Sequence, residues 1–387
     1  MSDPVDWGTT TLPWCSFSTA GAAPRVGVGV GTCVLDVAAA LPDLAEELAG
    51  GTIDGVLSYP SERRAELRDR LLELVASGVE EHLVPQAAVT LHLPWTVRDY
   101  VDFYASEHHA SNLGRLFRPD SEPLTPNWKH LPIGYHGRAG TVVVSGTDVV
   151  RPSGQRRTPD GEIVFGPSTR LDIEAEVGFV VGGPSVRGPL TLAEAEDRLF
   201  GVCLVNDWSA RDLQAWEYVP LGPFLGKSFA TSVSPWVVPM EALAGARVAP
   251  PTRDVALLPY LDDADATAGG LDLALEVRLD GEVVSRPPYA AMYWTPAQML
   301  AHLCVNGASV RPGDLFASGT VSGPAREERG ALIELTWNGT EPIVLPDGTT
   351  RSFLEDGDTV SISATAPGAG GERVPLGEVV GRVVPAS

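Results

Sequence analysis

The chain has 387 residues, of which 44% are hydrophobic and 20% are charged, a composition typical of a globular protein with a substantial core. Its formal net charge of −22 argues against binding to nucleic acid or to an anionic membrane, because both need a basic face. The sequence has no apolar run long enough to span a bilayer and no signal-peptide pattern at its start, so we expect a cytoplasmic protein. Four widely spaced cysteines disfavour a thiolate metal site and a disulfide framework.

The first 93 residues are predicted to form a small β-rich domain. Residues 25–36 alternate valine with glycine, which predicts a hairpin rather than a phosphate-binding loop. A helix is predicted from about Ser58 to Gly78, with Pro60 in its first turn and leucines along one face.

Strands dominate the second predicted domain, residues 94–387. We expect them at residues 141–145, 172–181, 201–205, 271–279, 331–337 and 359–363. Two clear helices are predicted over residues 192–199, behind a Thr191–Glu194 capping box, and over residues 296–305. Because strands and helices do not alternate, the chain is predicted to be mainly β, of the α+β class, and not a doubly wound nucleotide fold.

Two acids stand side by side on one predicted strand. The two-residue period of residues 171–177 sends the apolar side chains to one face and Asp172, Glu174 and Glu176 to the other. Adjacent carboxylates repel each other unless a cation lies between Glu174 and Glu176. The alternative is a strand face that points into solvent.

Two further acids occupy similar positions. Asp207 follows an apolar strand, and Asp102 lies between aromatic residues, although either one also suits the cap of a helix. Together with Glu174 and Glu176 they supply only oxygen ligands, which suits Mg²⁺ or Ca²⁺ rather than zinc. The sequence therefore predicts a site for a hard divalent cation.

Polar and basic residues follow Asp207. If residues 209–218 are helical, Arg211, Gln214 and Tyr218 share one face that can bind an anionic substrate, and the alternative is an incidental polar stripe. Lys227 is one of two lysines in a chain with 26 arginines, which hints that a compact charge is needed there. A helix from residue 102 would project Asp102 and His109 to the same side.

At this point several long motifs closely resemble the fumarylacetoacetase family, and the likeness covers nearly the whole chain. The motifs are the segments at residues 99–104, 109–114, 126–128, 134–138, 206–212, 220–229, 311–315 and 318–320. The resemblance implies a small N-terminal SH3-like barrel, a C-terminal mixed β-sandwich roll and a homodimer. It also implies hydrolysis of the carbon–carbon bond of 4-fumarylacetoacetate to fumarate and acetoacetate, the last step of tyrosine and phenylalanine catabolism.

Residue roles follow from the same resemblance, position by position. It implies a metal centre with Lys227 and Thr231 near the ion and with four ligands, Asp102, Glu174, Glu176 and Asp207. His109 matches a catalytic base and Glu334 the carboxylate that orients it. The implied substrate contacts are Tyr104, Arg118, Tyr135, Gln214, Tyr218 and Thr320. The chemistry also needs donors for an oxyanion, for which we expect Arg211, Gln214 and Lys227.

The chain departs from the family pattern at two places: the family has glycine at Ala230, and its better-known members have arginine and glutamine at Glu107 and His108. The second departure places an acid near the expected mouth of the site. The main alternative is a hydrolase of another 1,3-diketo acid, such as an acylpyruvate or fumarylpyruvate. A hydratase or decarboxylase on the same metal site and a catalytically silent binding protein are further alternatives, which the paired His109 and Glu334 disfavour.

Overall fold

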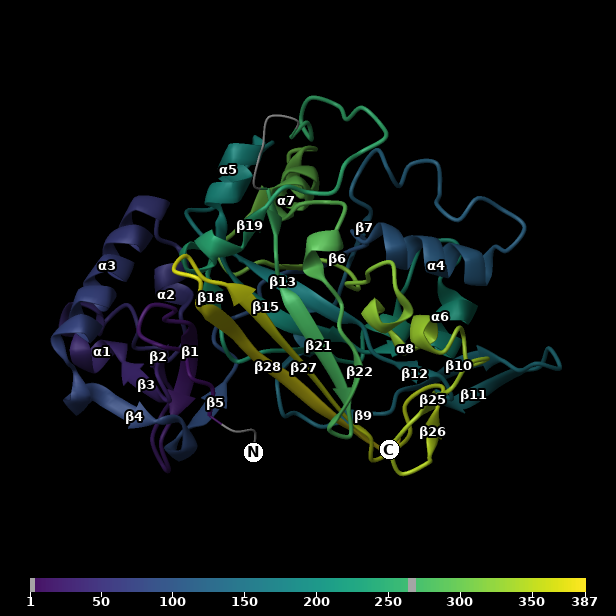
Figure 1. Cartoon of the computed structure of the whole chain (residues 1–387), viewed down its shortest axis with the longest axis horizontal. Helices are drawn as coiled ribbons and strands as arrows, with labels where there is room; N and C mark the ends of the chain where they lie inside the picture. Colours follow the sequence, from purple (N-terminus) through teal and green to yellow (C-terminus); the bar gives the residue numbers. More distant parts are fainter. Residues whose placement is uncertain (1–3, 264–268) are drawn as a thin grey trace.

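The computed structural model describes residues 4–263 and 269–387 (Figure 1). Its N-terminal part is an antiparallel sheet with strand order β4-β3-β2-β1-β5. The strands are β1 (Trp14–Ser18), β2 (Arg25–Val30), β3 (Cys33–Asp36), β4 (Leu83–Pro85) and β5 (Thr90–His92). β2 and β3 pair from Gly27 opposite Asp36 to Val30 opposite Cys33, so the predicted hairpin over residues 25–36 is confirmed.

Helices cover this sheet. They are α1 (Val37–Ala40), α2 (Asp54–Leu57) and α3 (Ser61–Ser77). The predicted helix is present as α3, but it begins at Ser61, so Pro60 is its N-cap and not part of its first turn as predicted. Gly78 ends the helix with a φ of 86°, a conformation that favours glycine. Leu67 and Leu71 lie on the buried face of α3 and pack the helix against the sheet.

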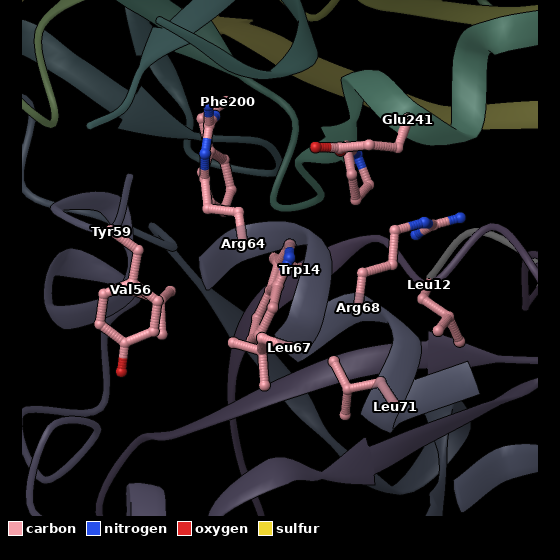
Figure 2. A pocket seen from close by; sticks show the side chains of 11 residues that line it. Leu12, Trp14, Val56, Tyr59, Arg64, Leu67, Arg68, Leu71, Phe200 and Glu241 are labelled. Atoms are coloured by element: carbon pink, nitrogen blue, oxygen red, sulfur yellow. The ribbon is translucent and has the colours of Figure 1, made fainter. Parts of the chain in front are cut away.

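The N-terminal part is joined tightly to the rest of the chain. Arg64 of α3 donates a 3.2 Å hydrogen bond to the carbonyl of Leu199 and another to that of Asp197, and Trp14 forms a β-bridge with Val237. Figure 2 shows the pocket at this seam, where Arg64 lies beside Phe200. Its cavity of about 20 Å³ holds roughly one water molecule. The seam is therefore a structural contact and not a metabolite site.

A large mixed sheet forms the centre of the C-terminal part, with strand order β7-β6-β24-β13-β15-β17-β8 and β18 paired to β15. Its strands are β6 (Tyr100–Phe103), β7 (Gly134–His136), β8 (Val142–Val144), β13 (Ala175–Val181), β15 (Leu199–Asp207), β17 (Thr231–Val233), β18 (Val238–Pro239) and β24 (Leu315–Ala317). β13 and β15 are buried along their whole length, and they carry acids at the same end of the sheet.

A second sheet, ordered β22-β21-β27-β28-β9, packs across the central one, with β27 and β28 lying against β15 (Figure 1). Its strands are β9 (Val149–Val150), β21 (Ala274–Leu279), β22 (Glu282–Ser285), β27 (Thr359–Pro367) and β28 (Arg373–Val384). Apolar side chains from both sheets fill the space between them. The strand-rich α+β architecture that the sequence predicts is therefore present.

Short strand pairs and helices surround the two sheets. The pairs are β10 (Ser153–Arg157) with β11 (Ile163–Pro167), β12 (Leu171–Asp172) with β16 (Ser209–Ala210), β14 (Val186–Arg187) with β23 (Ser309–Val310), β19 (Arg247–Val248) with β20 (Gly270–Leu271), and β25 (Ile343–Val344) with β26 (Thr350–Arg351). The helices are α4 (Glu107–Phe117), α5 (Leu192–Asp197), α6 (Arg211–Glu217), α7 (Pro296–Cys304) and α8 (Leu332–Leu335). Within the described ranges, no helix is both long and apolar enough to cross a membrane.

Several predicted boundaries are wrong in detail. The expected strand over residues 172–181 is broken at Ile173 and Glu174, between β12 and β13. The capping box of α5 is present, but the helix ends at Asp197 and Leu199 begins β15. Residues 209 and 210 belong to β16, so the helix expected over residues 209–218 is confirmed only as α6.

The prediction of a strand over residues 331–337 is wrong, because the segment contains helix α8. The carboxylate of Asp172 accepts hydrogen bonds from the backbone amides of Leu332 and Ile333, at 2.7 and 3.1 Å. A carboxylate that binds the first free amides of a helix stabilises its N-terminus. The apolar, β-like local sequence is thus overridden by an acid that lies 160 residues away in the chain.

Candidate active site

Four carboxylates converge at one end of the central sheet. Asp102 comes from β6, Glu176 from β13 and Asp207 from the last position of β15, while Glu174 lies in the break before β13. One oxygen of each lies within 4.8 Å of the others, and all four side chains are buried. Neither the solvent-facing strand nor the helix-cap alternative for these acids is correct, because the side chains point into one buried cluster.

Glu174 forms ion pairs with two basic side chains of the protein. Its oxygens lie 2.7 Å from Nη2 of Arg211 and 2.5 Å from Nζ of Lys227. Burial raises the pKa of Glu174, but the charges of Lys227 and Arg211 outweigh burial and hold the pKa below its usual value. Glu174 is therefore ionised in the folded protein.

Glu176 and Asp102 have the opposite environment. Both oxygens of Glu176 and Oδ1 of Asp102 are buried without a hydrogen-bond partner among the described residues. Burial raises the pKa of each carboxyl far above its usual value, and the charge of Asp102 adds to the effect on Glu176, as that of Asp207 does on Asp102. Unpartnered buried carboxylate oxygens are what a hard cation requires, so this donor set fits a divalent metal ion.

Asp207 accepts three hydrogen bonds. Its donors are Nζ of Lys227 at 2.8 Å, Oγ1 of Thr231 at 2.9 Å and the hydroxyl of Tyr135 at 3.1 Å. Burial raises the pKa of Asp207, and Lys227 only partly offsets it. Lys227, which lies between Asp207 and Glu174, is buried, and these two carboxylates raise its pKa in spite of that burial. The expected proximity of Lys227 and Thr231 to the acids is thus present in the structure.

His109 and Glu334 form a buried pair beside the acid cluster. Nδ1 of His109 lies 2.6 Å from Oε2 of Glu334, and its Nε2 lies 4.0 Å from Oε1 of Glu174. The interpretation that one helix carries both Asp102 and His109 is wrong: Asp102 lies on β6, and Ser106 caps α4 by accepting from the amide of His109 at 3.2 Å. Two separate elements therefore bring these side chains together.

Arg211 links the acid cluster to helix α8. Its Nε lies 2.8 Å from Oδ2 of Asp172, which also binds the amides of α8, and its Nη1 lies 3.3 Å from Oε1 of Gln214. The charges of Glu174 and Asp172 raise the pKa of Arg211 even though burial opposes them. Asp172 thus holds both Arg211 and the helix that carries Glu334. The sequence placed Asp172 on the acidic face of a predicted strand but did not indicate this role.

The predicted substrate contacts divide into two groups. Tyr104, whose ring centroid lies 5.4 Å from that of His109, and Tyr135 are half-buried near the acids, and Thr320 is buried with a hydroxyl that has no partner among the described side chains. Arg118 and Tyr218 are exposed, and Arg118 donates to the carbonyl of Pro123 at 2.9 Å. The structure therefore places Tyr104 and Tyr135 at the site, with the half-buried Gln214 bound to Arg211, and leaves Arg118 and Tyr218 on the surface.

Glu107 does not add an unpaired charge at the mouth of the site. Its carboxylate lies 3.0 Å from Nζ of Lys129, which also binds Asp254 at 2.9 Å. The two lysines of the chain thus each connect two acids. Sequence reasoning missed this contact, and it also missed Asn112 and Ser322, which bind Glu334; for Asn112 the signal was its place in the motif at residues 109–114.

The chain is similar in sequence to known proteins. The family model described as "Fumarylacetoacetate (FAA) hydrolase C-terminal" matches residues 99–384. The chain is 42% identical to the fumarylacetoacetase of Homo sapiens over 419 residues, which cover 100% of this chain and 98% of the human one.

Two solved structures with a similar fold have low sequence identity to this chain. A fumarylacetoacetate hydrolase from Exiguobacterium antarcticum is 18% identical with a TM-score of 0.57, covering 97% of this chain and all of its own. Maleylpyruvate hydrolase from Sphingobium sp. SYK-6, in complex with manganese(II) and pyruvate, is 14% identical with a TM-score of 0.56 and the same coverage. With a family model over most of its length and a full-length relative at 42% identity, the chain belongs to the fumarylacetoacetase family.

Proposed function

We propose that the protein hydrolyses the carbon–carbon bond of 4-fumarylacetoacetate to fumarate and acetoacetate, the last step of tyrosine and phenylalanine catabolism. One observation carries the proposal: the buried four-carboxylate cluster lies beside the His109–Glu334 pair in a chain that matches the human enzyme over its full length. A small anionic diketo acid is therefore the substrate.

The metal centre consists of Asp102, Glu174, Glu176 and Asp207, which hold Mg²⁺ or Ca²⁺ in this proposal. The oxygen-only donor set and the unpartnered oxygens of Glu176 support it, and so does the manganese ion in the maleylpyruvate hydrolase. A bound ion would supply Lewis-acid stabilisation of the negative charge that develops on the substrate. Lys227 and Thr231 orient Asp207 through the hydrogen bonds described above.

His109 is the base in this scheme. Glu334 binds the Nδ1 side of the ring, so Nε2 faces the acid cluster and accepts a proton from water. The oxygen of that water attacks the ketone carbon of the fumaryl group. The bond to the acetoacetate fragment then breaks, its electron pair stays on the acetoacetate carbon, and that carbon receives the proton.

Arg211, Gln214 and Lys227 are the proposed donors to the oxyanion that water addition creates. Arg211 and Lys227 are buried, and their ion pairs with Glu174 hold both heads in place before substrate arrives. Preorganised donors stabilise developing charge without a reorganisation cost. Gln214 contacts Arg211 and lies one helical turn along α6.

The proposed substrate contacts are Tyr104, Arg118, Tyr135, Gln214, Tyr218 and Thr320. The unpartnered hydroxyl of Thr320 and the half-buried ring of Tyr104 support two of them. Arg118 and Tyr218 reach a substrate only if their segments turn inward, since both side chains are exposed. Arg118 would then bind a terminal carboxylate.

The test is a direct assay. Purified protein is mixed with fumarylacetoacetate, or with acylpyruvates as competing substrates, and loss of the diketone absorbance is followed before and after metal stripping. We expect metal-dependent loss with fumarylacetoacetate and a much lower kcat/KM with acylpyruvates. Equal or greater activity on acylpyruvates would reject the proposed specificity, and full activity without metal would reject the metal centre.

We also propose a cytoplasmic homodimer. Apolar side chains are exposed along the segment that follows α6, with Val219 at 67%, Leu221 at 97% and Phe224 at 64%. Such a patch is unfavourable in water and is typical of an interface. The segment leads directly to Lys227, so a partner subunit that covers it would also order the site. Light scattering should give a dimer for the natural chain and a monomer for Leu221→Asp. A monomeric natural chain would reject the proposal.

The proposed cytoplasmic location is supported by the four free cysteines, which suit a reducing compartment.

The domain organisation is a proposal of the same kind. We place an SH3-like barrel at residues 1–93 and the catalytic β-sandwich roll at residues 94–387. The antiparallel order of the N-terminal sheet supports the first unit. The two units share their cores, because one apolar cluster contains Trp14 together with Phe200 and Val237. We therefore expect them to unfold together.

A further inference from the structure

Three polar side chains lie along one face of helix α4. His109, Asn112 and Arg115 follow each other at intervals of three residues, so they project to the same side. Asn112 donates from Nδ2 to Oε1 of Glu334 at 2.9 Å, and its Oδ1 accepts from Nη1 of Arg115 at 3.2 Å. The arrangement is a continuous chain of hydrogen bonds from the surface to the proposed base.

Glu334 is fully buried and receives three hydrogen bonds from side chains. His109 and Ser322 bind Oε2, at 2.6 and 2.9 Å, and Asn112 binds Oε1. An ionised carboxylate only accepts hydrogen bonds, so three donors favour the ionised form. Burial raises the pKa of Glu334, while the charge of His109 and these hydrogen bonds lower it below its usual value.

The two additional donors are themselves fixed. Arg115 donates to the carbonyl oxygen of the Asn112 amide, so the NH₂ group faces Glu334; a flipped amide would place oxygen against a carboxylate. Oγ of Ser322 accepts from the amide of Gly330 at 3.1 Å, which leaves its hydrogen for Glu334. Ser106, the cap of α4, donates to the carbonyl of Ser322 at 3.2 Å.

We propose that Asn112 and Ser322 are positioning residues, which lock the plane of the Glu334 carboxylate so that His109 keeps its proton on Nδ1 and presents Nε2 to the acid cluster. Arg115 acts one step further out by fixing the amide of Asn112. Among the described residues, the side-chain hydrogen bonds of Asn112 and Ser322 go to Glu334, Arg115 and Gly330 and not to the four acids of the cluster. The inference rests on the proposed function only for its kinetic consequence, because the hydrogen bonds exist whatever the substrate is.

The kinetic experiment uses the full-length, metal-loaded protein. Asn112→Leu keeps the size and removes the donor, and Ser322→Ala removes the hydroxyl. Loss of a hydrogen bond to a charged group is expected to lower kcat about tenfold to a hundredfold. KM and the affinity for Mg²⁺, measured by titration calorimetry, should stay within about twofold, because ground-state binding is untouched. Asn306→Leu, on an exposed turn, is the matched control and should keep kcat unchanged.

The second measurement is independent of turnover. In protein labelled with ¹⁵N-histidine, the Nδ1–H signal of His109 is assigned by its loss in His109→Gln. We expect Asn112→Leu and Ser322→Ala to move or broaden that signal. Arg115→Met, a surface change that leaves the buried contacts in place, should lower kcat about threefold and move the signal in the same direction.

The outcomes separate the possibilities. Unchanged kcat with an unchanged Nδ1–H signal in these variants overturns the positioning role. A fall in kcat that is matched by loss of Mg²⁺ affinity and a lower melting temperature also overturns it, since the role is then merely structural. If the natural protein does not cleave fumarylacetoacetate, the proposed function fails, while the nitrogen-resolved spectra still decide the positioning role.

Discussion

Replacing Glu176 with glutamine tests how the buried acids couple metal binding to folding. Both oxygens of Glu176 are buried without a partner among the described residues, and burial, followed by the charges of Asp102 and Glu174, raises its pKa well above 4.5. The folded metal-free protein therefore keeps a proton on Glu176 that the unfolded chain releases above that pH. A raised carboxyl pKa means that stability falls as pH rises from the unfolded value toward the folded one.

The size of the effect follows from the proton free energy. As long as the folded chain keeps this proton, each pH unit above 4.5 lowers the free energy of unfolding by about 1.4 kcal/mol. Glutamine has the same shape and carries no charge, so Glu176→Gln removes this cost. The metal-free variant should therefore be more stable than the natural chain at neutral pH, by about 1.4 kcal/mol for each pH unit over which the natural chain keeps the proton, although it no longer binds the ion.

Urea unfolding of chelator-treated protein at several pH values between about 5 and 7.5 measures the effect. The variant should show a flatter dependence of stability on pH, and Mg²⁺ or Ca²⁺ should stabilise the natural chain much more than the variant. The exposed Glu282→Gln is the matched control and should behave like the natural chain. Parallel curves for the variant and the natural chain without metal would refute the reasoning, as would equal stabilisation of both by the ion.

Three further predictions concern the same site. His109→Ala should lower kcat by a factor of about 10² to 10⁴ with nearly unchanged folding and metal affinity, and natural-like kinetics would remove the water-activation scheme. Glu174→Gln should weaken metal affinity strongly in titration calorimetry, and activity that survives a chelator would contradict its assignment as a ligand. Asp172→Asn should cost about 3 kcal/mol in urea unfolding, because the buried Arg211 loses a charged partner; a loss under about 1 kcal/mol would contradict that account.

The acid cluster was predictable because its residues violate ordinary patterns. In the sequence, Glu174 and Glu176 face the same side of a predicted strand whose other face is apolar, and Asp207 ends a buried strand. Repulsion between neighbouring carboxylates is a property of the sequence alone, and it pointed to a cation without any knowledge of the fold. The broad architecture was likewise predictable from strands that do not alternate with helices.

The segment around Glu334 shows what local sequence does not determine. Its apolar, β-like residues predict a strand, but the charge of Asp172 at the first amides makes the segment a helix. That contact exists only after β12 and the loop before α8 have come together. The roles of Asn112 and Ser322 depend in the same way on rotamers and burial, which the order of residues does not specify.

The charges within the site explain why the buried acid cluster favours a divalent ion. Arg211 lies between Asp172 and Glu174, and Lys227 lies between Glu174 and Asp207, so the protein's own cations contact three of the buried acids. Glu176 and Asp102 form no salt bridge among the described residues, and burial raises the pKa of both carboxyls well above the usual value. In a buried site, two uncompensated carboxylates require either two protons or one divalent cation. The same imbalance that destabilises the metal-free fold at neutral pH would therefore provide the driving force for binding a divalent ion.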